Sequence, residues 1–433
     1  MTGGAYGKEP AGPAVSRKLR NFRWYICGLL FLATVLNYVD RQVFSILAPD
    51  LERDIGWSEL SYSRIVIAFQ LSYALSLMFS GRLIDRIGTK LGYVLGMLWW
   101  SSAEMAHALA RTPLGFGFVR AALGIGEATN FPTAMKAISE WFPRTDAGLA
   151  TGILNSGPTI GAIAAPLFVP LVAAHWGWRG AFVMTGAIEG AWLVAWWKLY
   201  HKPEVHPLIG QDELRLIRSG RGAGPKDGVS YLRLLRCRQT WAYSLGKVLA
   251  DPAWFFYLFW LPKFLAQEHG LRGTAVIPYL TTDYVFCGAG SALGGYLSSS
   301  LVKRGWTVNR SRKTAMAISA FLMPVVILAA QARNAWTAVL LIGITLALHQ
   351  SWSTLVYTMG TDLFPSRAMA SVTGLAGALG SAATILFAEI TGRVLEHDSS
   401  AYLPLFIACG LMYLVAWIAI HLLVPRLEPA RIE

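Results

Sequence analysis

Two stretches of the sequence place a carboxylate and a guanidinium inside long apolar runs. One reads Asn37-Tyr38-Val39-Asp40-Arg41, and the other begins at Arg120 and ends at Glu127. A buried carboxylate beside an arginine can alternate between a charged, paired state and a neutral, protonated state, because burial favours the neutral form and the cation favours the charged form. Protonation would free the arginine to hold an anionic substrate. The pattern predicts proton coupling, and the alternative is static ion pairs that fix helix packing.

A third stretch combines a lysine, an aspartate and a proline with a dense aromatic run. Lys247 and Asp251 are four residues apart and face each other on a helix. Pro252 interrupts the backbone hydrogen bonds at this point. In the aromatic run that follows, Trp254 could stack on a sugar ring, whereas most of the other rings are expected to face lipid or pack between helices. Lys247 either binds a ligand or extends to the membrane interface.

Three further ionisable residues interrupt apolar runs, namely Glu104, Glu189 and His349. An ionisable residue in a spanning helix costs roughly 2.5–3.5 kcal/mol on insertion scales, so each one is by default a candidate for function. A single histidine among apolar residues is more often a hydrogen-bonded structural residue than a ligand. The sequence suggests no role for Glu104 or Glu189.

The composition shows what kind of protein holds these residues. Of 433 residues, 54% are hydrophobic and 15% are charged, and the mean hydropathy is +0.44. A soluble domain has roughly 45–50% apolar and about 25% charged residues, which excludes a soluble globular protein. The net charge of +13 fits basic membrane loops, so no nucleic-acid partner is predicted. Four dispersed cysteines form no metal or disulfide pattern, and we predict no metal site and no enzyme activity.

Twelve runs have the length and apolar content of spanning helices, which need roughly 20 residues each. The predicted fold is therefore an all-α integral membrane protein with two six-helix bundles. Its predicted parts are a cytoplasmic tail (1–21), a first bundle (22–200), a cytoplasmic linker (201–239), a second bundle (240–425) and a second tail (426–433). The expected spans are 22–45, 58–81, 89–109, 112–139, 146–174, 178–200, 240–266, 276–302, 313–331, 334–359, 367–391 and 402–424.

The basic residues predict how the spans are oriented in the lipid bilayer. Of the 38 lysines and arginines, 27 lie near the ends that share a side with both tails and the linker, and 7 lie on the other side. Basic residues collect in cytoplasmic loops, so both termini are expected in the cytoplasm. The first twenty residues lack the apolar core of a cleavable signal peptide.

A motif after the second span points to a family. The stretch Gly81-Arg82-Leu83-Ile84-Asp85-Arg86-Ile87-Gly88-Thr89-Lys90 resembles the G-x-L-x-D-R-x-G-x-[RK] signature of the major facilitator superfamily. Its glycines permit tight turning and close helix approach. Asp85 can pair with basic neighbours such as Arg86 at the seam between the bundles. We therefore predict a gate at Gly81, Asp85, Arg86 and Gly88, and substrate carried between the halves by alternating access.

A second resemblance is more specific. The stretch from Gly126-Glu127 through Phe131-Pro132 to Asn155-Ser156-Gly157 closely resembles the bacterial hexuronate transporters of the anion:cation symporter family, and further matches lie in both halves. The resemblance implies proton-coupled uptake of glucuronate and galacturonate across the bacterial inner membrane, with protons as the coupling ion and no other cofactor. It implies that Asp40 and Glu127 are proton sites, that Arg41 and Arg120 are their partners, and that Arg41 contacts the substrate carboxylate.

The same resemblance implies that Tyr38 and Tyr73 contact sugar hydroxyls. Added substrate-binding candidates are Lys136, Asn155, Lys247 and Trp254. Alternatives are symport of another organic anion (an aldonate, aldarate or carboxylate), proton-driven antiport, or a non-transporting sensor. Antiport is considered because Ser156-Gly157-Pro158-Thr159-Ile160-Gly161 partly matches the drug:proton antiporters. We expect a monomer.

Overall fold

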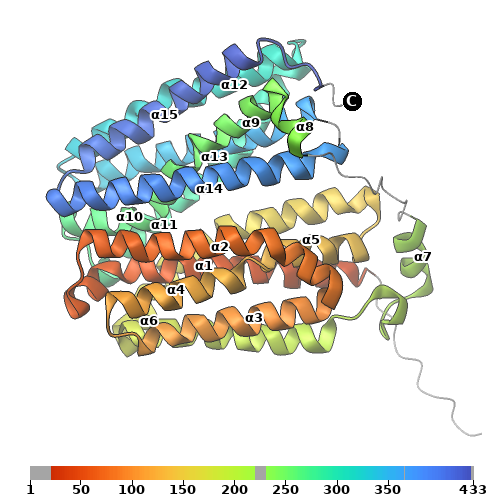
Figure 1. Cartoon of the computed structure of the whole chain (residues 1–433), viewed down its shortest axis with the longest axis horizontal. Helices are drawn as coiled ribbons and strands as arrows, with labels where there is room; N and C mark the ends of the chain where they lie inside the picture. Colours follow the sequence, from red (N-terminus) through yellow and green to blue (C-terminus); the bar gives the residue numbers. More distant parts are fainter. Residues whose placement is uncertain (1–20, 220–230, 365, 431–433) are drawn as a thin grey trace, which may run out of the picture.

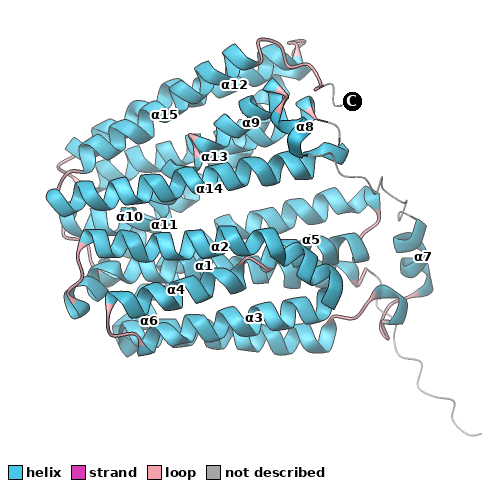
Figure 2. Ribbon diagram, viewed as in Figure 1, coloured by secondary structure: helices cyan, strands magenta, loops and turns pink. Residues whose placement is uncertain are grey.

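The computed structural model describes residues 21–219, 231–364 and 366–430. The described residues form helices joined by short loops and contain no strand (Figure 2). Figure 1 shows α1 to α6 packed together on one side and α9 to α15 on the other. We call residues 22–200 the first half and residues 240–425 the second half. The linker end is the end where α7 and α8 lie, and the opposite end is the far end.

The first half contains a set of long helices that run between the two ends. Its elements are α1 (Arg23–Ile55), α2 (Glu59–Ile87), α3 (Thr89–Ala106), η1 (His107–Leu109), α4 (Pro113–Glu127), α5 (Asn130–Trp141) and α6 (Arg144–Leu199). The 56 residues of α6 would extend about 84 Å as one helix, far more than a bilayer core of about 30 Å. The backbone leaves the helical conformation at Gly177 (φ 67°, ψ 176°), so α6 consists of two spans, as predicted.

The linker and the second half follow the same pattern. The linker holds η2 (Pro203–Val205), α7 (Gln211–Ser219) and α8 (Tyr231–Leu235). The second half contains α9 (Arg238–Val248), α10 (Asp251–His269), η3 (Gly273–Val276), α11 (Ile277–Lys303), α12 (Val308–Leu322), η4 (Met323–Gln331), α13 (Ala335–Leu363), α14 (Ser366–His397) and α15 (Tyr402–Leu423).

By length and composition alone, eight helices among the described residues are long and apolar enough to cross a membrane. The difference from the twelve expected spans has a physical cause. One of the eight is the double span of α6, and three spans are short, interrupted or polar: α3 with η1, α4 with α5, and α9 with α10. Counted with these, the fold has the twelve spans that were predicted.

Two sequence-based boundaries are wrong. The fourth span was expected to be continuous from 112 to 139, but the helix breaks at Ala128 and Thr129. Pro132 explains the break, because a proline lacks an N–H donor and its ring clashes with the carbonyl four residues earlier. Gly81 was expected at a helix end, but α2 continues to Ile87, and Gly88 makes the turn with φ 85°. A Cβ at Gly81 would meet no atom within 4 Å, so this glycine does not serve a close helix approach.

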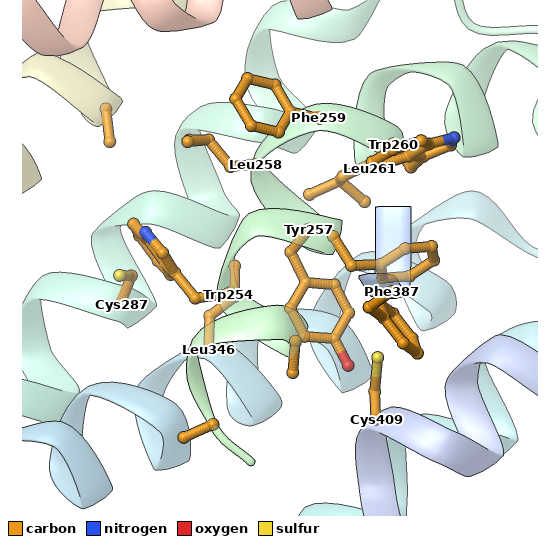
Figure 3. Close-up of a cluster of buried hydrophobic side chains, with 14 of the residues drawn as sticks. Trp254, Tyr257, Leu258, Phe259, Trp260, Leu261, Cys287, Leu346, Phe387 and Cys409 are labelled. Atoms are coloured by element: carbon orange, nitrogen blue, oxygen red, sulfur yellow. The ribbon is translucent and has the colours of Figure 1, made fainter. Parts of the chain in front are cut away.

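The predicted break of the seventh span is confirmed. Helix α9 ends at Val248 and α10 begins at Asp251, with Pro252 in its first turn. The aromatic run of α10 packs between helices rather than facing lipid (Figure 3). Tyr257, Phe259 and Trp260 are all buried, and Phe256 packs edge-on against Phe387 of α14.

The linker helix α7 is docked on the first half. The carboxylate of Glu213 accepts hydrogen bonds from the backbone N–H groups of Phe22 and Arg23 at 2.9 and 3.1 Å, and it also pairs with the Arg23 guanidinium at 3.1 Å. These N–H groups lie at the start of α1, where a helix leaves its first donors unsatisfied and favours a negative charge. Arg23 also pairs with Asp146 at the start of α6. Glu213 therefore caps α1 and anchors the linker.

Polar contacts join the two halves at the far end. Lys263 of α10 pairs with Glu52 of α1 at 2.9 Å and with Glu59 of α2 at 2.7 Å. The Tyr62 hydroxyl donates to the Phe259 carbonyl at 2.7 Å. Lys263 is buried, so its two carboxylate partners balance a charge that is shielded from solvent. These contacts tie α1 and α2 to α10.

Candidate functional site

The centre of the first half holds a buried ion pair between two helices. The Nε atom of Arg41 on α1 lies 2.7 Å from Oε2 of Glu127 at the end of α4. The two side chains are 4% and 0% exposed. Pairs of this kind are stable only when each charge is matched, because removal of one partner leaves an unpaired charge in a low-dielectric interior.

Three aromatic rings surround the Arg41 guanidinium. Its central carbon lies 4.6 Å from the ring centroid of Tyr73, 4.9 Å from that of Tyr38 and 5.3 Å from that of Phe69. Rings at this distance attract a cation through their electron-rich faces. Tyr38 and Tyr73, predicted from the resemblance to contact sugar hydroxyls, both lie beside Arg41, and their contact with a sugar stays a prediction.

Two glycines allow the helices to approach closely enough for this pair. A Cβ at Gly124 would lie 2.7 Å from the carbonyl oxygen of Phe69 on α2, and a Cβ at Gly126 would lie 2.7 Å from the Cβ of Trp100 on α3. Real Cβ atoms do not approach other atoms this closely. The glycines of α4 therefore let α2 and α3 pack against its backbone just before Glu127.

Arg120 lies on α4, seven residues before Glu127 and nearer to the far end. Its guanidinium carbon is 4.4 Å from the ring centroid of Phe44. It interacts electrostatically with Asp40, Glu104 and Glu127, yet none of its three nitrogens has a hydrogen-bond partner among the described residues. Arg120 is thus a buried cation that has more than one carboxyl group in electrostatic range and no described hydrogen bond to any of them.

Asp40 faces a different helix from Arg41. Its carboxyl group is in hydrogen-bonding contact with that of Glu189 on α6. Glu189 also accepts a hydrogen bond of 2.6 Å from the indole N–H of Trp100 on α3. Glu104, on α3, lies 3.5 Å from the Thr185 hydroxyl and 3.6 Å from the His107 ring.

The pairing expected from sequence is therefore only partly correct. We expected each carboxylate to pair with arginine in a set of Asp–Arg and Glu–Arg pairs. The structure pairs Arg41 with Glu127 across two helices. The Asp40 carboxyl group contacts that of Glu189, and its interaction with Arg120 is electrostatic, without a hydrogen bond. Successive residues on a helix point about 100° apart, so Asp40 and Arg41 point toward different helices, α6 and α4.

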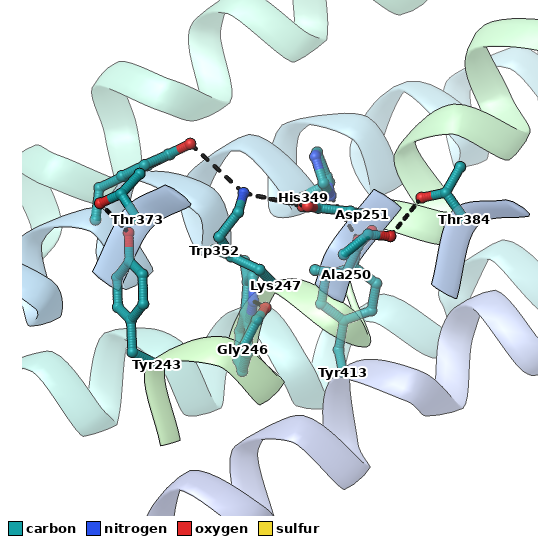
Figure 4. A network of polar contacts seen from close by, with 12 residues as sticks. Tyr243, Gly246, Lys247, Ala250, Asp251, His349, Trp352, Thr373, Thr384 and Tyr413 are labelled. Atoms are coloured by element: carbon teal, nitrogen blue, oxygen red, sulfur yellow. Dashed lines mark hydrogen bonds and ion pairs between the residues drawn. The ribbon is translucent and has the colours of Figure 1, made fainter. Parts of the chain in front are cut away.

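A second polar group lies at the break between α9 and α10 (Figure 4). Lys247 pairs with Asp251 at 3.2 Å, as the four-residue spacing predicted, and its ammonium lies 3.5 Å from the Tyr357 hydroxyl of α13. Tyr357 in turn is within electrostatic range of Tyr38. The group around Lys247 therefore lies across from the group around Arg41. Tyr357 of the second half and Tyr38 of the first half lie between them.

Trp254 and His349 belong to a packed structural unit. The Trp254 ring stacks on the His349 ring with centroids 5.2 Å apart and planes 9° apart. Nδ1 of His349 is 2.6 Å from the Tyr413 hydroxyl. His349 is thus hydrogen-bonded and buried, which agrees with its expected structural role. One face of Trp254 is covered by this histidine, so only the other face is left for a sugar ring.

The remaining candidates lie elsewhere. Lys136 on α5 donates to the Ile84 carbonyl at 3.0 Å, near the linker end of α2. Asn155 is exposed on α6, and Arg86 is exposed in the last turn of α2. No described contact joins these three to Arg41. The predicted role of the Asp85 side chain lies outside the side chains that the structure describes.

Sequence reasoning missed Asp283. This aspartate of α11 is fully buried, and neither of its carboxylate oxygens has a hydrogen-bond partner among the described residues. The signal was available, because Asp283 lies inside a predicted span just as Glu104 does. It differs from Asp40 in having no ionisable neighbour that perturbs it among the described side chains.

These features define a multi-pass helical membrane protein with ionisable groups buried between its spans. Residues 30–388 match the family model of the Major Facilitator Superfamily. The chain belongs to this superfamily, and it is a transporter rather than an enzyme.

Known proteins resemble it along most of its length. A hexuronate transporter of Escherichia coli (strain K12) is 33% identical over 397 residues, which cover 90% of this chain and 91% of that protein. A galacturonate transporter of Dickeya chrysanthemi is 33% identical over 313 residues, which cover 71% of this chain and 90% of that protein. The crystal structure of a bacterial homologue of the human lysosomal transporter Spinster, inward-facing and occupied, has the same fold, with a TM-score of 0.77 at 20% identity over 94% of this chain and 98% of that one.

Proposed function

We propose that this protein is a proton-coupled symporter that carries an anionic sugar acid, a hexuronate such as glucuronate or galacturonate, into the cytoplasm by alternating access. It would lie in the bacterial inner membrane with both termini in the cytoplasm, in agreement with the distribution of basic residues. The relatives named as hexuronate and galacturonate transporters support the substrate class.

The observation that carries the proposal is the Arg41–Glu127 pair. In this pair the charge of Arg41 is balanced by a carboxylate that belongs to the protein. A substrate carboxylate can replace Glu127 only if Glu127 becomes neutral, since otherwise a second carboxylate would be buried without a partner. Protonation of Glu127 and binding of an anion at Arg41 are therefore coupled by competition for a single guanidinium.

The surroundings of Arg41 suit a sugar acid. Tyr38 and Tyr73 flank the guanidinium and offer hydroxyl groups to sugar hydroxyls. Tyr357 and Lys247 lie on the opposite side, where the Lys247 ammonium is paired with Asp251. Once Glu127 is protonated, the Arg41 guanidinium favours an anion and repels a cationic drug, which argues against the antiporter alternative.

The contacts at the far end support an alternating-access cycle. Lys263 holds α10 against α1 and α2, so the far end is tied in this conformation. We propose that the site is reached from the linker end here, and that these contacts part when the transporter opens to the other side. The motif from Gly81 to Gly88 would form the matching gate at the linker end.

The test is uptake of labelled glucuronate and galacturonate into proteoliposomes, with and without an inward proton gradient. We expect accumulation that collapses when a protonophore is added. Uptake without accumulation would contradict proton coupling. No uptake of either sugar acid by folded, reconstituted protein would overturn the substrate, and a panel of aldonates, aldarates and other carboxylates would follow.

A further inference from the structure

Two carboxyl groups from different spans face each other inside the first half. Asp40 of α1 is 1% exposed and Glu189 of α6 is 0% exposed. Oδ2 of Asp40 and Oε2 of Glu189 have no hydrogen-bond donor among the described residues, although the two carboxyl groups are in hydrogen-bonding contact. A carboxylate oxygen can only accept a hydrogen bond. The contact between them is therefore satisfied only if one of the two groups carries a proton.

The indole of Trp100 determines which of the two carboxyl groups accepts the hydrogen bond between them. It donates to Oε1 of Glu189 at 2.6 Å, and hydrogen bonds to a charged acceptor are shorter than those between neutral groups. A donor of this kind stabilises the ionised form of Glu189. No hydrogen bond from a neutral or cationic donor to Asp40 is described. The arrangement therefore places the proton on Asp40, from which it is donated to Glu189.

The charge balance of the surrounding cluster requires protons as well. Asp40 and Arg41 come from α1, Glu104 from α3, Arg120 and Glu127 from α4, and Glu189 from α6, with Tyr62 of α2 and His107 of η1 beside them. Four carboxyl groups thus face two guanidinium groups. With His107 neutral, the cluster is neutral only when two of the four carboxyl groups are protonated. Buried charge without a partner is costly, so the neutral cluster is the stable one.

We propose that Asp40 and Glu189 form one shared proton site, in which Glu189 is a positioning residue that holds the transported proton on Asp40 and Trp100 sets how tightly the pair holds it. This inference rests on the proposed proton symport, and it adds a residue of the sixth span to the coupling machinery. Release of the proton leaves two adjacent carboxylates, so the pair needs Arg120 nearby in the deprotonated state. Arg120 is suited to this because its nitrogens are not committed to another acceptor among the described residues.

Two substitutions are expected to move the pH dependence of transport in opposite directions. In Glu189→Gln the amide oxygen still accepts from Trp100, while the amide N–H donates to the Asp40 carboxylate. Asp40 then ionises more easily, and half-maximal proton-driven uptake shifts by about one pH unit toward acid. In Trp100→Phe the ionised pair loses its donor, so the pair retains its proton to higher pH and the midpoint shifts toward alkali.

The matched control is Asp283→Asn, which removes the other fully buried span aspartate among the described side chains and is expected to leave the midpoint unchanged. Substrate counterflow, which needs no net proton movement, should continue in Glu189→Gln. An infrared pH titration supplies a readout without transport, because the band of a protonated carboxylic acid assigned through Asp40→Asn should titrate at lower pH in Glu189→Gln.

The outcomes separate this inference from the proposed function. If wild-type protein shows no proton-driven uptake, the symport proposal fails, whereas the infrared titration still tests the shared proton. If wild-type protein is a symporter and Glu189→Gln has an unchanged midpoint and an unchanged carboxylic acid band, the shared site is refuted. Shifts of Glu189→Gln and Trp100→Phe in the same direction would also refute it. Should Trp100→Phe not fold, Glu189→Gln alone decides.

Discussion

The buried charges of the two halves are satisfied in different ways. In the first half, four carboxyl groups and two guanidinium groups from α1, α3, α4 and α6 share one cluster, and Arg120 has several carboxyl groups in range without a fixed hydrogen bond. In the second half, Lys247 is paired with Asp251, and His349 is fixed between Trp254 and Tyr413. Asp283 has no partner at all among the described residues.

This difference suggests that the two halves have different roles. Groups that have several possible partners can exchange them when a proton or an anion arrives, whereas groups with one fixed partner hold a shape. The first half is therefore suited to couple protonation to binding. The second half is suited to provide a rigid wall, with its break between α9 and α10 held by the Trp352 indole, which donates to the Gly246 carbonyl at 2.9 Å. Each of the following predictions tests this difference in roles.

The largest effect is expected from Glu127→Gln. The amide cannot be ionised, so it neither holds Arg41 as an ion pair nor responds to protons. Proton-driven accumulation should be lost completely, while substrate counterflow continues because Arg41 remains free for the anion. The measurement is uptake against a gradient compared with exchange at equal concentrations. Full accumulation by this variant would show that the cluster of the first half does not couple protons.

Asp283→Asn is the matched control for the same assay. It replaces a fully buried span carboxyl group of the second half with an amide of the same shape. We expect accumulation within about twofold of wild type, because the ionisable groups that interact with Asp283 are Tyr284 and Cys287, which belong to the second half and not to the cluster of the first half. A loss comparable to that of Glu127→Gln would mean that coupling extends into the second half.

The next largest effect is expected where the halves meet. Lys263→Met leaves Glu59 and Glu52 without their cation, and breaking a buried pair costs about 3–5 kcal/mol. Arg53→Met is the control, because its pairs with Asp50 and Asp54 involve a side chain that is 65% exposed. Such a surface pair contributes about 0.2–1 kcal/mol. Thermal unfolding in detergent should show a clearly larger loss for Lys263→Met, and equal losses would remove Lys263 as the link between the halves.

A smaller effect is expected from packing within the first half. Gly126→Ala places a methyl group against Trp100, and overpacking of this kind costs about 1–3 kcal/mol. Gly117→Ala lies on the same helix with no atom within 4 Å of the added Cβ, so it should be neutral or slightly stabilising. The two variants are compared by unfolding temperature and by proton-driven uptake. Similar behaviour would show that the close approach of α3 and α4 is not needed to assemble the cluster.

The sequence predicted the fold better than it predicted the pairing. Apolar runs and basic loops were sufficient for twelve spans, since both follow from the bilayer as a solvent. The break at Ala128 was missed even though Pro132 signals it locally. The types of the site residues were predicted, because ionisable side chains in apolar runs stand out. Their partners depend on which helices lie side by side, and no spacing along one helix contains that information.

Glu189 shows why the partners of the site residues could not be predicted from the sequence. It was recognised as an ionisable residue in a span and given no role, because its meaning depends on Asp40, about 150 residues earlier, and on Trp100. The arginine next to Asp40 in sequence suggested the wrong partner for the same reason. Local sequence specifies which side chains are costly to bury, and tertiary packing determines how that cost is offset.

The smallest expected effect concerns the histidine of the second half. His349→Asn removes the ring that stacks on Trp254 and the bond to the Tyr413 hydroxyl, and loss of one hydrogen bond costs about 1 kcal/mol. Stability in detergent should fall by about this amount, while the pH midpoint of uptake stays where it is in wild type. Tyr413→Phe removes the same bond from its other end, together with a 3.4 Å bond to the Ala250 carbonyl, and it should also leave the midpoint unchanged. If either variant moves the midpoint, His349 takes part in proton transfer, and the contrast between a titrating first half and a structural second half no longer holds.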